Sequence, residues 1–132
     1  MDLRDNTLRK DERLSGKKSI ATLLADGRWG SYACLRYCWL AREVPEGEEV
    51  PASRVLVAVP KRLFKRAVKR NLLKRRIREA WRRQKIAGID ILLQYNSPEP
   101  AAYREIWNAV AGIVRKIGGT SDTGGGEQQS VQ

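Results

Sequence analysis

A run of cationic side chains between residues 61 and 83 is the part of this sequence best suited to chemistry. Twelve of these 23 residues are Lys or Arg and one, Glu79, is acidic, so the segment carries the whole formal net charge of +11. The remaining 14 basic and 14 acidic residues cancel. A cationic field concentrated on one segment favours a polyanion as the binding partner.

The spacing within this segment predicts a helix with two different faces. On a period of 3.6 residues, one face is apolar and collects Leu73, Ile77, Ala80 and Trp81. An adjacent face carries hydrogen-bond donors, namely Asn71, Lys74, Arg75, Arg78 and Arg82, with Arg70 and Arg66 one and two turns before Leu73. Arg can bind phosphate through two hydrogen bonds. We therefore expect the apolar face to pack on a sheet and the cationic face to bind an anion. A solvated face without a partner is the alternative, but such runs usually mix charges of both signs.

The residues needed for catalysis on this chain are missing. The sequence has no His, which removes the usual base near neutral pH, and no phosphate-binding glycine motif. Cys34 and Cys38 lack the further partners that a metal site needs, and we expect them to be small apolar fillers. The glutamates of residues 43 to 53 lie in one Pro- and Gly-containing stretch, which reads as a solvated loop. We therefore predict no catalytic residue and no metal ligand.

Length and composition indicate one small domain with loose ends. The chain has 132 residues, 42% of them hydrophobic, and no apolar run long enough to cross a membrane. The first residues lack the apolar centre of a signal peptide, so we expect a cytoplasmic protein without a membrane partner. We predict a disordered N-terminus over 1–10, a single RNA- or DNA-binding domain over 11–117, and a flexible Gly-, Ser- and Gln-rich tail over 118–132.

The pattern of apolar residues predicts the element order α-β-β-α-β-α. The expected strands lie over 32–42, 54–60 and 89–95, with the basic helix between the second and the third. A first helix is expected within 13–27, capped by Ser15 or Ser19. A last helix is expected over 103–117, after a turn in which Ser97 can act as a cap. A strand, helix and strand in succession predict a parallel pair within an α+β fold. General rules favour a right-handed crossover.

Residues 70 to 81, R-N-L-L-K-R-R-I-R-E-A-W, resemble the R-N-R-x-K-R-x-x-R-E signature helix of the bacterial ribonuclease P protein subunit. The resemblance extends over about Arg13 to Ile117. It includes Arg13-Leu14 with Lys17-Lys18, the strand from Arg54 to Lys61, and the strand that begins at Asp90. Leu72 departs from the pattern, because the family has Arg there.

The resemblance implies a fold and a function. The fold would be a two-layer α/β sandwich like domain 2 of ribosomal protein S5, with a left-handed β-α-β crossover in place of the right-handed one. The protein would join a catalytic RNA subunit in the ribonuclease P ribonucleoprotein, an endoribonuclease that removes the 5′ leader of precursor tRNA. The RNA, with bound Mg²⁺, would perform the hydrolysis. The expected RNA-contacting residues are Arg70, Asn71, Lys74, Arg75 and Arg78, to which the local charge adds Arg82, Lys61 and Arg66.

The family also has a cleft for the leader, lined by aromatic residues of the first helix and first strand. Ile20 and Leu24 stand at the helix positions in this chain, with Lys17 and Lys18 near the start of the helix. Tyr37 and Trp39 lie two residues apart in a strand and therefore share one sheet face. They either replace the missing rings in the cleft, the role slightly favoured here, or belong to the core.

Three other functions are possible on these residues. A ribosomal or ribosome-associated RNA-binding protein could use the same helix without any part in cleavage. A nuclease acting alone is disfavoured because no metal cluster is visible. A peripheral membrane protein is disfavoured because Leu73, Ile77 and Trp81 are needed for the core.

Overall fold

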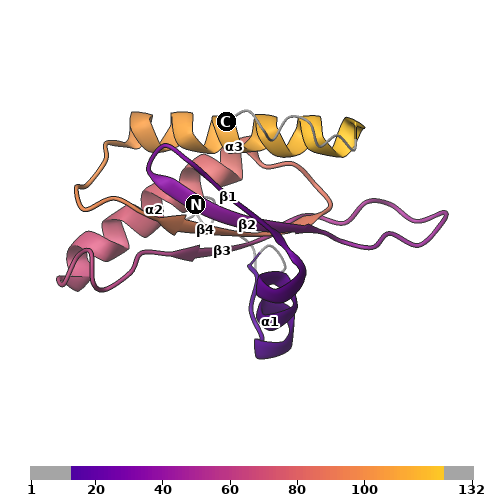
Figure 1. The fold of residues 1–132 in the computed structure, drawn as a ribbon, viewed down its shortest axis with the longest axis horizontal. Helices are drawn as coiled ribbons and strands as arrows, with labels where there is room; N and C mark the ends of the chain where they lie inside the picture. The colour runs from indigo at the N-terminus through magenta and orange to yellow at the C-terminus, as the bar shows by residue number, and fades with distance from the viewer. Residues whose placement is uncertain (1–12, 124–132) are drawn as a thin grey trace, which may run out of the picture.

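The computed structural model describes residues 13–123, and their side chains through residue 118. The predicted N-terminal disorder over 1–10 lies outside the described residues. The elements in chain order are α1 (Lys17–Asp26), β1 (Arg28–Tyr32), β2 (Leu35–Ala41), β3 (Arg54–Ala58), α2 (Ala67–Gln84), β4 (Ile89–Tyr95) and α3 (Tyr103–Thr123). The strands form one sheet in the order β1-β2-β4-β3 (Figure 1). β3 and β4 are parallel and the other pairs are antiparallel, so the predicted parallel pair is confirmed.

Two helices cover one face of this sheet. α2 and α3 lie side by side on that face, and α1 lies on the other (Figure 1). The predicted apolar face of α2 is buried, with Leu73, Ile77, Ala80 and Trp81 at most 1% exposed. α3 buries its own apolar side there, through Ile106, Val110, Ile113 and Ile117. The α+β class is therefore confirmed.

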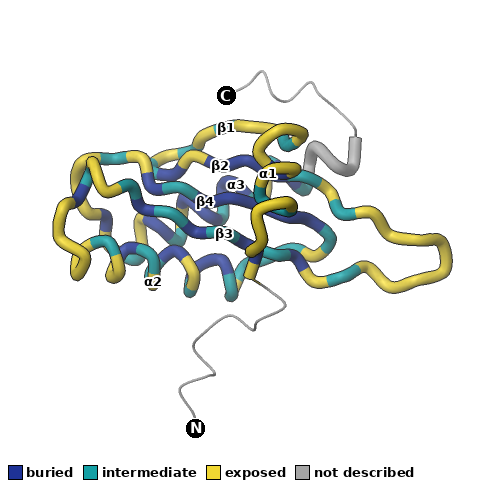
Figure 2. Tube along the Cα trace, turned by 90° about the horizontal axis from the view of Figure 1, so that it is seen from below, coloured by how far each residue is buried: buried dark blue, intermediate teal, exposed yellow. Residues whose placement is uncertain are grey.

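The opposite face of the sheet is only partly covered. Leu23 of α1 packs with Leu14, Cys38 and Leu92 in a second, smaller core. Seen from this side, α1 crosses part of the sheet and leaves the rest open (Figure 2). Arg36 of β2 and Ser31 of β1 remain exposed there.

A hairpin replaces the single strand that the sequence predicts over residues 32 to 42. β1 pairs with β2 across a turn at Ala33 and Cys34. Ala33 has a φ of 54°, a left-handed conformation that usually requires Gly, Asn or Asp. Since Ala gives no turn signal, the sequence pattern missed β1.

The ends of the helices also differ from the prediction. Gly16, with a φ of 95°, precedes α1, and no side chain caps that helix, so neither Ser15 nor Ser19 does so. Ser97 bonds within its own loop, where its Oγ accepts from the N–H of Glu99. At the start of α3, Glu105 accepts a hydrogen bond from the N–H of Ala102 at 3.2 Å. α3 continues to Thr123, six residues past the predicted end of the domain at 117.

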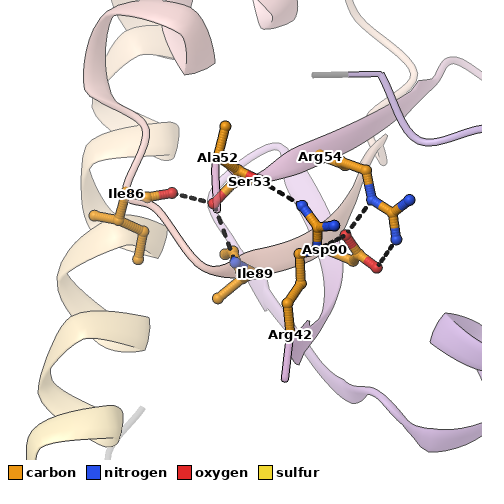
Figure 3. A network of polar contacts seen from close by, with 7 residues as sticks. All are labelled: Arg42, Ala52, Ser53, Arg54, Ile86, Ile89 and Asp90. Carbon is orange, nitrogen blue, oxygen red and sulfur yellow. Dashed lines mark hydrogen bonds and ion pairs between the residues drawn. The ribbon is translucent and has the colours of Figure 1, made fainter. Parts of the chain in front are cut away.

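A polar network joins the ends of the acidic loop to the sheet (Figure 3). Asp90 is 8% exposed, and its carboxylate accepts two hydrogen bonds from Arg54 at 2.9 and 2.8 Å, while Arg42 lies 3.8 Å from it. These hydrogen bonds raise the pKa of Arg54. Ser53 donates to the carbonyl of Ile86 and accepts from the N–H of Ile89. The four glutamates of the loop, Glu43, Glu46, Glu48 and Glu49, are exposed, as predicted.

Tyr37 and Trp39 face α2 and α3 and belong to the core. They are 7% and 9% exposed and lie in the same buried cluster as the apolar residues of both helices. Their partners in the register are Leu93 and Ile91 of β4, which are fully buried. The expectation that they line an open cleft is therefore wrong, because their sheet face is the one that the two helices cover.

We predict that Trp39→Ala lowers the free energy of unfolding by about 3–5 kcal/mol, the usual cost of emptying the space of a buried Trp. The measurement is urea or thermal unfolding of both proteins. Trp29→Ala is the matched control, because Trp29 is 45% exposed and its loss should cost much less. Equal stability of wild type and Trp39→Ala would contradict the core assignment.

Candidate nucleic-acid interface

α2 carries most of the cationic residues that the sequence singled out, and burial of its apolar face turns them outward. Asn71, Arg75 and Arg78 are exposed and Lys74 is half-buried. Lys61 and Arg66, in the segment that leads into α2, are exposed too. The outer turns of the helix lie beyond β3, along one edge of the sheet (Figure 2). The fold therefore leaves these side chains exposed or half-buried.

Some cations of α2 are held by the protein itself. Arg70 donates to the carbonyls of Phe64 and Lys65, both at 2.8 Å, and so fixes the chain that enters the helix. Arg76 donates to the carbonyl of Ala101 at 2.6 Å, which joins α2 to the start of α3. Both side chains therefore hold parts of this protein in position. For Arg70 this differs from the prediction, which gave it only a contact with RNA.

A second group of α2 cations has no such bonds. Within residues 13 to 118, no hydrogen bond or ion pair holds Lys69, Lys74, Arg75 or Arg78. Burial lowers the pKa of Arg78, and the charge of Arg13 lowers it further. Arg13 is placed there by a bridge to Val55 on the edge strand β3. In the sequence, Arg13 was noted only as part of the motif that resembles the start of the family's domain. The position of Arg13 beside α2 was not predicted.

Glu79 offsets one of the positive charges at the C-terminal end of α2. Its carboxylate accepts hydrogen bonds from Arg82 at 3.2 and 2.9 Å and from Arg83. These bonds, first from Arg82 and then from Arg83, hold the pKa of Glu79 below its ordinary value of 4.5. Arg82 is thus already paired, which separates it from the unpaired Arg75 and Arg78.

The residues predicted to form a leader cleft are not all brought together. Lys17, Lys18 and Leu24 are exposed on α1, and Ile20 is half-buried against the smaller core. Tyr37 and Trp39 lie on the far side of the sheet, as described above. The sheet face beside α1 carries a different aromatic residue, Trp29 of β1.

The guanidinium of Arg36 lies 4.5 Å from the centre of the Trp29 ring. The two side chains border a hollow of about 430 Å³, which Gly30, Ser31 and Asn96 also line. The prediction overlooked this pair because it depends on β1, whose existence the sequence pattern did not reveal.

Metal-ligating side chains do not gather in the described part of the chain. No group of three or more Cys, Asp or Glu residues there could hold a metal ion. Both cysteines are free thiols, Cys38 buried and Cys34 half-buried, as predicted. No helix among the described residues is long and apolar enough to span a bilayer. The arrangement offers unpaired cations of a kind suited to phosphate on α2, and the exposed ring of Trp29 on the partly open sheet face.

The fold and this surface define a class of protein, the small α+β domain with one helix whose cationic face is suited to a polyanion. A family model described as Ribonuclease P matches residues 8–118. The chain therefore belongs to the ribonuclease P protein family.

Individual relatives agree with this assignment. A ribonuclease P protein component of Chlorobium phaeobacteroides is 42% identical over 82 residues, which cover 61% of this chain and 55% of the relative. One from Porphyromonas gingivalis strain W83 is 38% identical over 85 residues, covering 64% and 60%. The chain thus spans little more than half the length of these relatives.

Solved structures show the same fold. The RNase P protein of Staphylococcus aureus superposes with a TM-score of 0.67 at 21% identity, covering 80% of this chain and 94% of that one. The protein from Thermotoga maritima gives 0.66 at 19% identity, covering 80% and 96%. The observed architecture is therefore that of known RNase P proteins.

We predict that Glu79→Gln destabilises the protein at neutral pH by a few tenths to about 1 kcal/mol, since it removes a partly exposed ion pair. Because the pKa of Glu79 is depressed in the folded state, its contribution is present above about pH 4.5 and is lost as the pH falls through the folded pKa. Urea unfolding of both proteins between pH 7 and pH 3 measures this. A difference in stability that stays constant over the whole range would rule out the ionic origin.

Proposed function

We propose that this protein is the protein subunit of ribonuclease P. It binds the catalytic RNA subunit and the 5′ leader of precursor tRNA, and assists Mg²⁺-dependent endonucleolytic removal of the leader in the cytoplasm. The observation that carries the proposal is the row of α2 cations Lys74, Arg75 and Arg78, which have no partner among the described residues, in a member of this family. The ribosomal alternative is not favoured by the family membership.

The cationic row is suited to an RNA backbone. Lys74 and Arg78 lie about one turn apart along the helix, and Arg75 is turned by about 100° from Lys74, so the three charges form a compact group on the outer side of α2. Like charges this close repel one another, and phosphates would relieve the repulsion. Arg13 adds a further charge beside Arg78. We assign this surface, with Asn71, Lys61 and Arg66, to the catalytic RNA.

The leader is assigned to the other side of the sheet, beside α1. Ile20 and Leu24 offer apolar contact there, with Leu24 40% exposed, and Lys17 and Lys18 supply positive charge. Tyr37 and Trp39 have no part in this assignment, because they are buried under the helices.

The chemistry is assigned to the RNA subunit. The sequence has no His, and the described residues contain no group of three carboxylate or thiol ligands. Mg²⁺ would be held by RNA phosphates and would supply the activated water. The side chains of this protein would bind and orient the RNA and lower the repulsion between enzyme and substrate.

We predict that Arg75→Ala and Arg78→Ala each weaken binding to the catalytic RNA. Each should reduce the slope of log K against log salt by about one, as expected for the loss of one phosphate contact. Filter binding or fluorescence titration over a range of salt concentrations measures both quantities. Arg115→Ala, which removes an exposed charge from α3, is the matched control and should leave the slope unchanged. Unchanged slopes for both α2 variants would assign the row to solvent.

We also predict that the purified protein alone does not cleave precursor tRNA at any Mg²⁺ concentration. With its RNA subunit it should lower the concentration of Mg²⁺ needed for cleavage, because its cations screen phosphate repulsion. Gel analysis of 5′-labelled precursor tRNA with protein, RNA and both follows the reaction. Cleavage at the mature 5′ end by RNA-free protein would refute a non-catalytic role. Sequencing of the RNA that copurifies with the protein identifies its partner independently.

A further inference from the structure

Two apolar side chains near the start of α2 are exposed among its cations. Val68 is 78% exposed and Leu72 is 40% exposed. They lie four residues apart, so they are neighbours on one face of the helix. The exposed cations around them are Lys61, Arg62, Lys65, Arg66 and Lys69, and we call these seven residues the entry face of α2. A phosphate backbone would bind the cations, but it has no apolar side chain to cover Val68 and Leu72.

The loop between β2 and β3 has the complementary pattern. Its residues 43 to 50 read E-V-P-E-G-E-E-V, and all of them are exposed. Among the described residues, no ion pair holds any of the glutamates of this loop. Val44 is 37% exposed and Val50 is 58% exposed. The loop therefore offers negative charge and apolar surface together, as the entry face offers positive charge and apolar surface.

Most of the exposed apolar side chains belong to these two segments. Six large hydrophobic residues are exposed in the described part of the chain, and four of them are Val44, Val50, Val68 and Leu72. Val68 and Val50 are the most exposed of the six, and each segment contains one of them. Single exposed apolar residues are common, but apolar residues gathered in two segments of opposite charge indicate surfaces that bind each other.

The loop and the entry face cannot meet within one molecule. β3 runs from the loop to the segment that leads into α2, so the two lie at opposite ends of the sheet (Figure 1). The base of the loop is also fixed, because the guanidinium of Arg42 donates to the carbonyl of Ala52 at 2.7 Å. A contact between loop and entry face therefore requires two molecules. Two antiparallel copies would bring the loop of each to the entry face of the other, in a closed two-fold arrangement.

We propose that the RNA-free protein associates with a second copy of itself, and that residues 43–50 of each copy cover the entry face of the other. The glutamates pair with the cations, while Val44 and Val50 cover Val68 and Leu72. The contact is small, so the association is weak, and it decreases as salt screens the charges. A second copy fits the entry face better than RNA does, because the loop supplies apolar side chains together with the negative charge.

The inference goes beyond the proposed function, because it concerns the protein before RNA binds. The entry face includes Lys61 and Arg66, which the proposed function assigns to the catalytic RNA. RNA and a second copy therefore compete for the same side chains. Self-association would shield the cations and apolar residues of the entry face until the RNA displaces the loop.

Sedimentation equilibrium of the RNA-free protein tests the association. At low salt and about 10 µM to 1 mM protein, the average mass should rise from that of a monomer toward that of a dimer, and about 1 M salt should reverse the rise. Val68→Ser should weaken the dimer about 5- to 30-fold, because it removes apolar contact without changing the charge. Leu24→Ser is the matched control and should have no effect, since Leu24 is as exposed as Leu72 but lies on α1. Wild-type protein that stays monomeric throughout would overturn the proposal.

An exchange of charges tests which surfaces meet. One variant carries Glu46→Lys and Glu48→Lys in the loop, and the other carries Lys65→Glu and Lys69→Glu in the entry face. Each alone should be monomeric, because like charges then face each other, whereas an equal mixture should dimerise, because both contacts are restored. Both variants remain net positive, so a general attraction cannot explain association of the mixture. Circular dichroism checks that both are folded. A monomeric mixture, or a dimer of either variant alone, would contradict the pairing of loop and entry face.

Addition of the catalytic RNA separates this inference from the proposed function. Loss of the dimer as the RNA binds supports both. A protein that dimerises as described but does not bind the catalytic RNA contradicts the proposed function and leaves the self-association standing. Catalytic RNA bound to an intact dimer would refute the competition. A Val68→Ser protein that binds RNA more weakly but dimerises normally would assign Val68 to RNA and overturn the contact between copies.

Discussion

Packing of the apolar face of α2 against the sheet is the interaction on which the rest of the structure depends. Each large side chain buried there contributes about 1.5–3 kcal/mol, whereas each pair of like charges on the helix costs a few tenths. Leu73, Ile77 and Trp81 are essentially inaccessible to water, so burial outweighs the repulsion by a wide margin. The helix can therefore remain folded with a cationic surface and without a bound anion. The same packing fixes which side chains face outward, and no loop has to position them.

The cations of α2 have separate tasks that their spacing alone does not show. Arg70 donates to the segment that enters α2, Arg76 donates to the carbonyl of Ala101 just before α3, and Arg82 and Arg83 share Glu79. The unpaired charges are concentrated in the middle of the helix, at Lys74, Arg75 and Arg78. A phosphate there meets donors that need not first break a protein bond. Substitution of Arg70 would combine lost packing with lost charge, so the middle positions give the cleaner test of RNA binding.

The basic helix was predictable because two strong signals coincide in it. Its apolar residues repeat at 3.6 and its charges fall on the remaining positions, so the sequence predicts both the buried face and the row. The parallel pair was predicted because a strand precedes and a strand follows that helix. The buried side of α3 was predicted from the helical repeat of its apolar residues. The caps of α1 and the hairpin at Ala33 were not predictable, because Gly16 and Ala33 give no side-chain signal for the structures they form. Because the hairpin was not predicted, the sequence could not assign Trp29 to a strand or to a face of the sheet.

The alternation of side chains along a strand does not say which face of the sheet a residue occupies, as Tyr37 and Trp39 illustrate. A period of two places both on one side of β2 but does not say which side. The pairing with β4 decides it, since Tyr37 and Trp39 are opposite Leu93 and Ile91, whereas Arg36 and Leu40 are opposite Gln94 and Asp90. The polar members of β4 cannot enter the larger core, so Arg36 must lie on the partly open face with them. Trp29 shares that face through its pairing with Cys38. The register of three strands thus places Trp29, and not Trp39, on the partly open face, which no single strand of the sequence could have revealed.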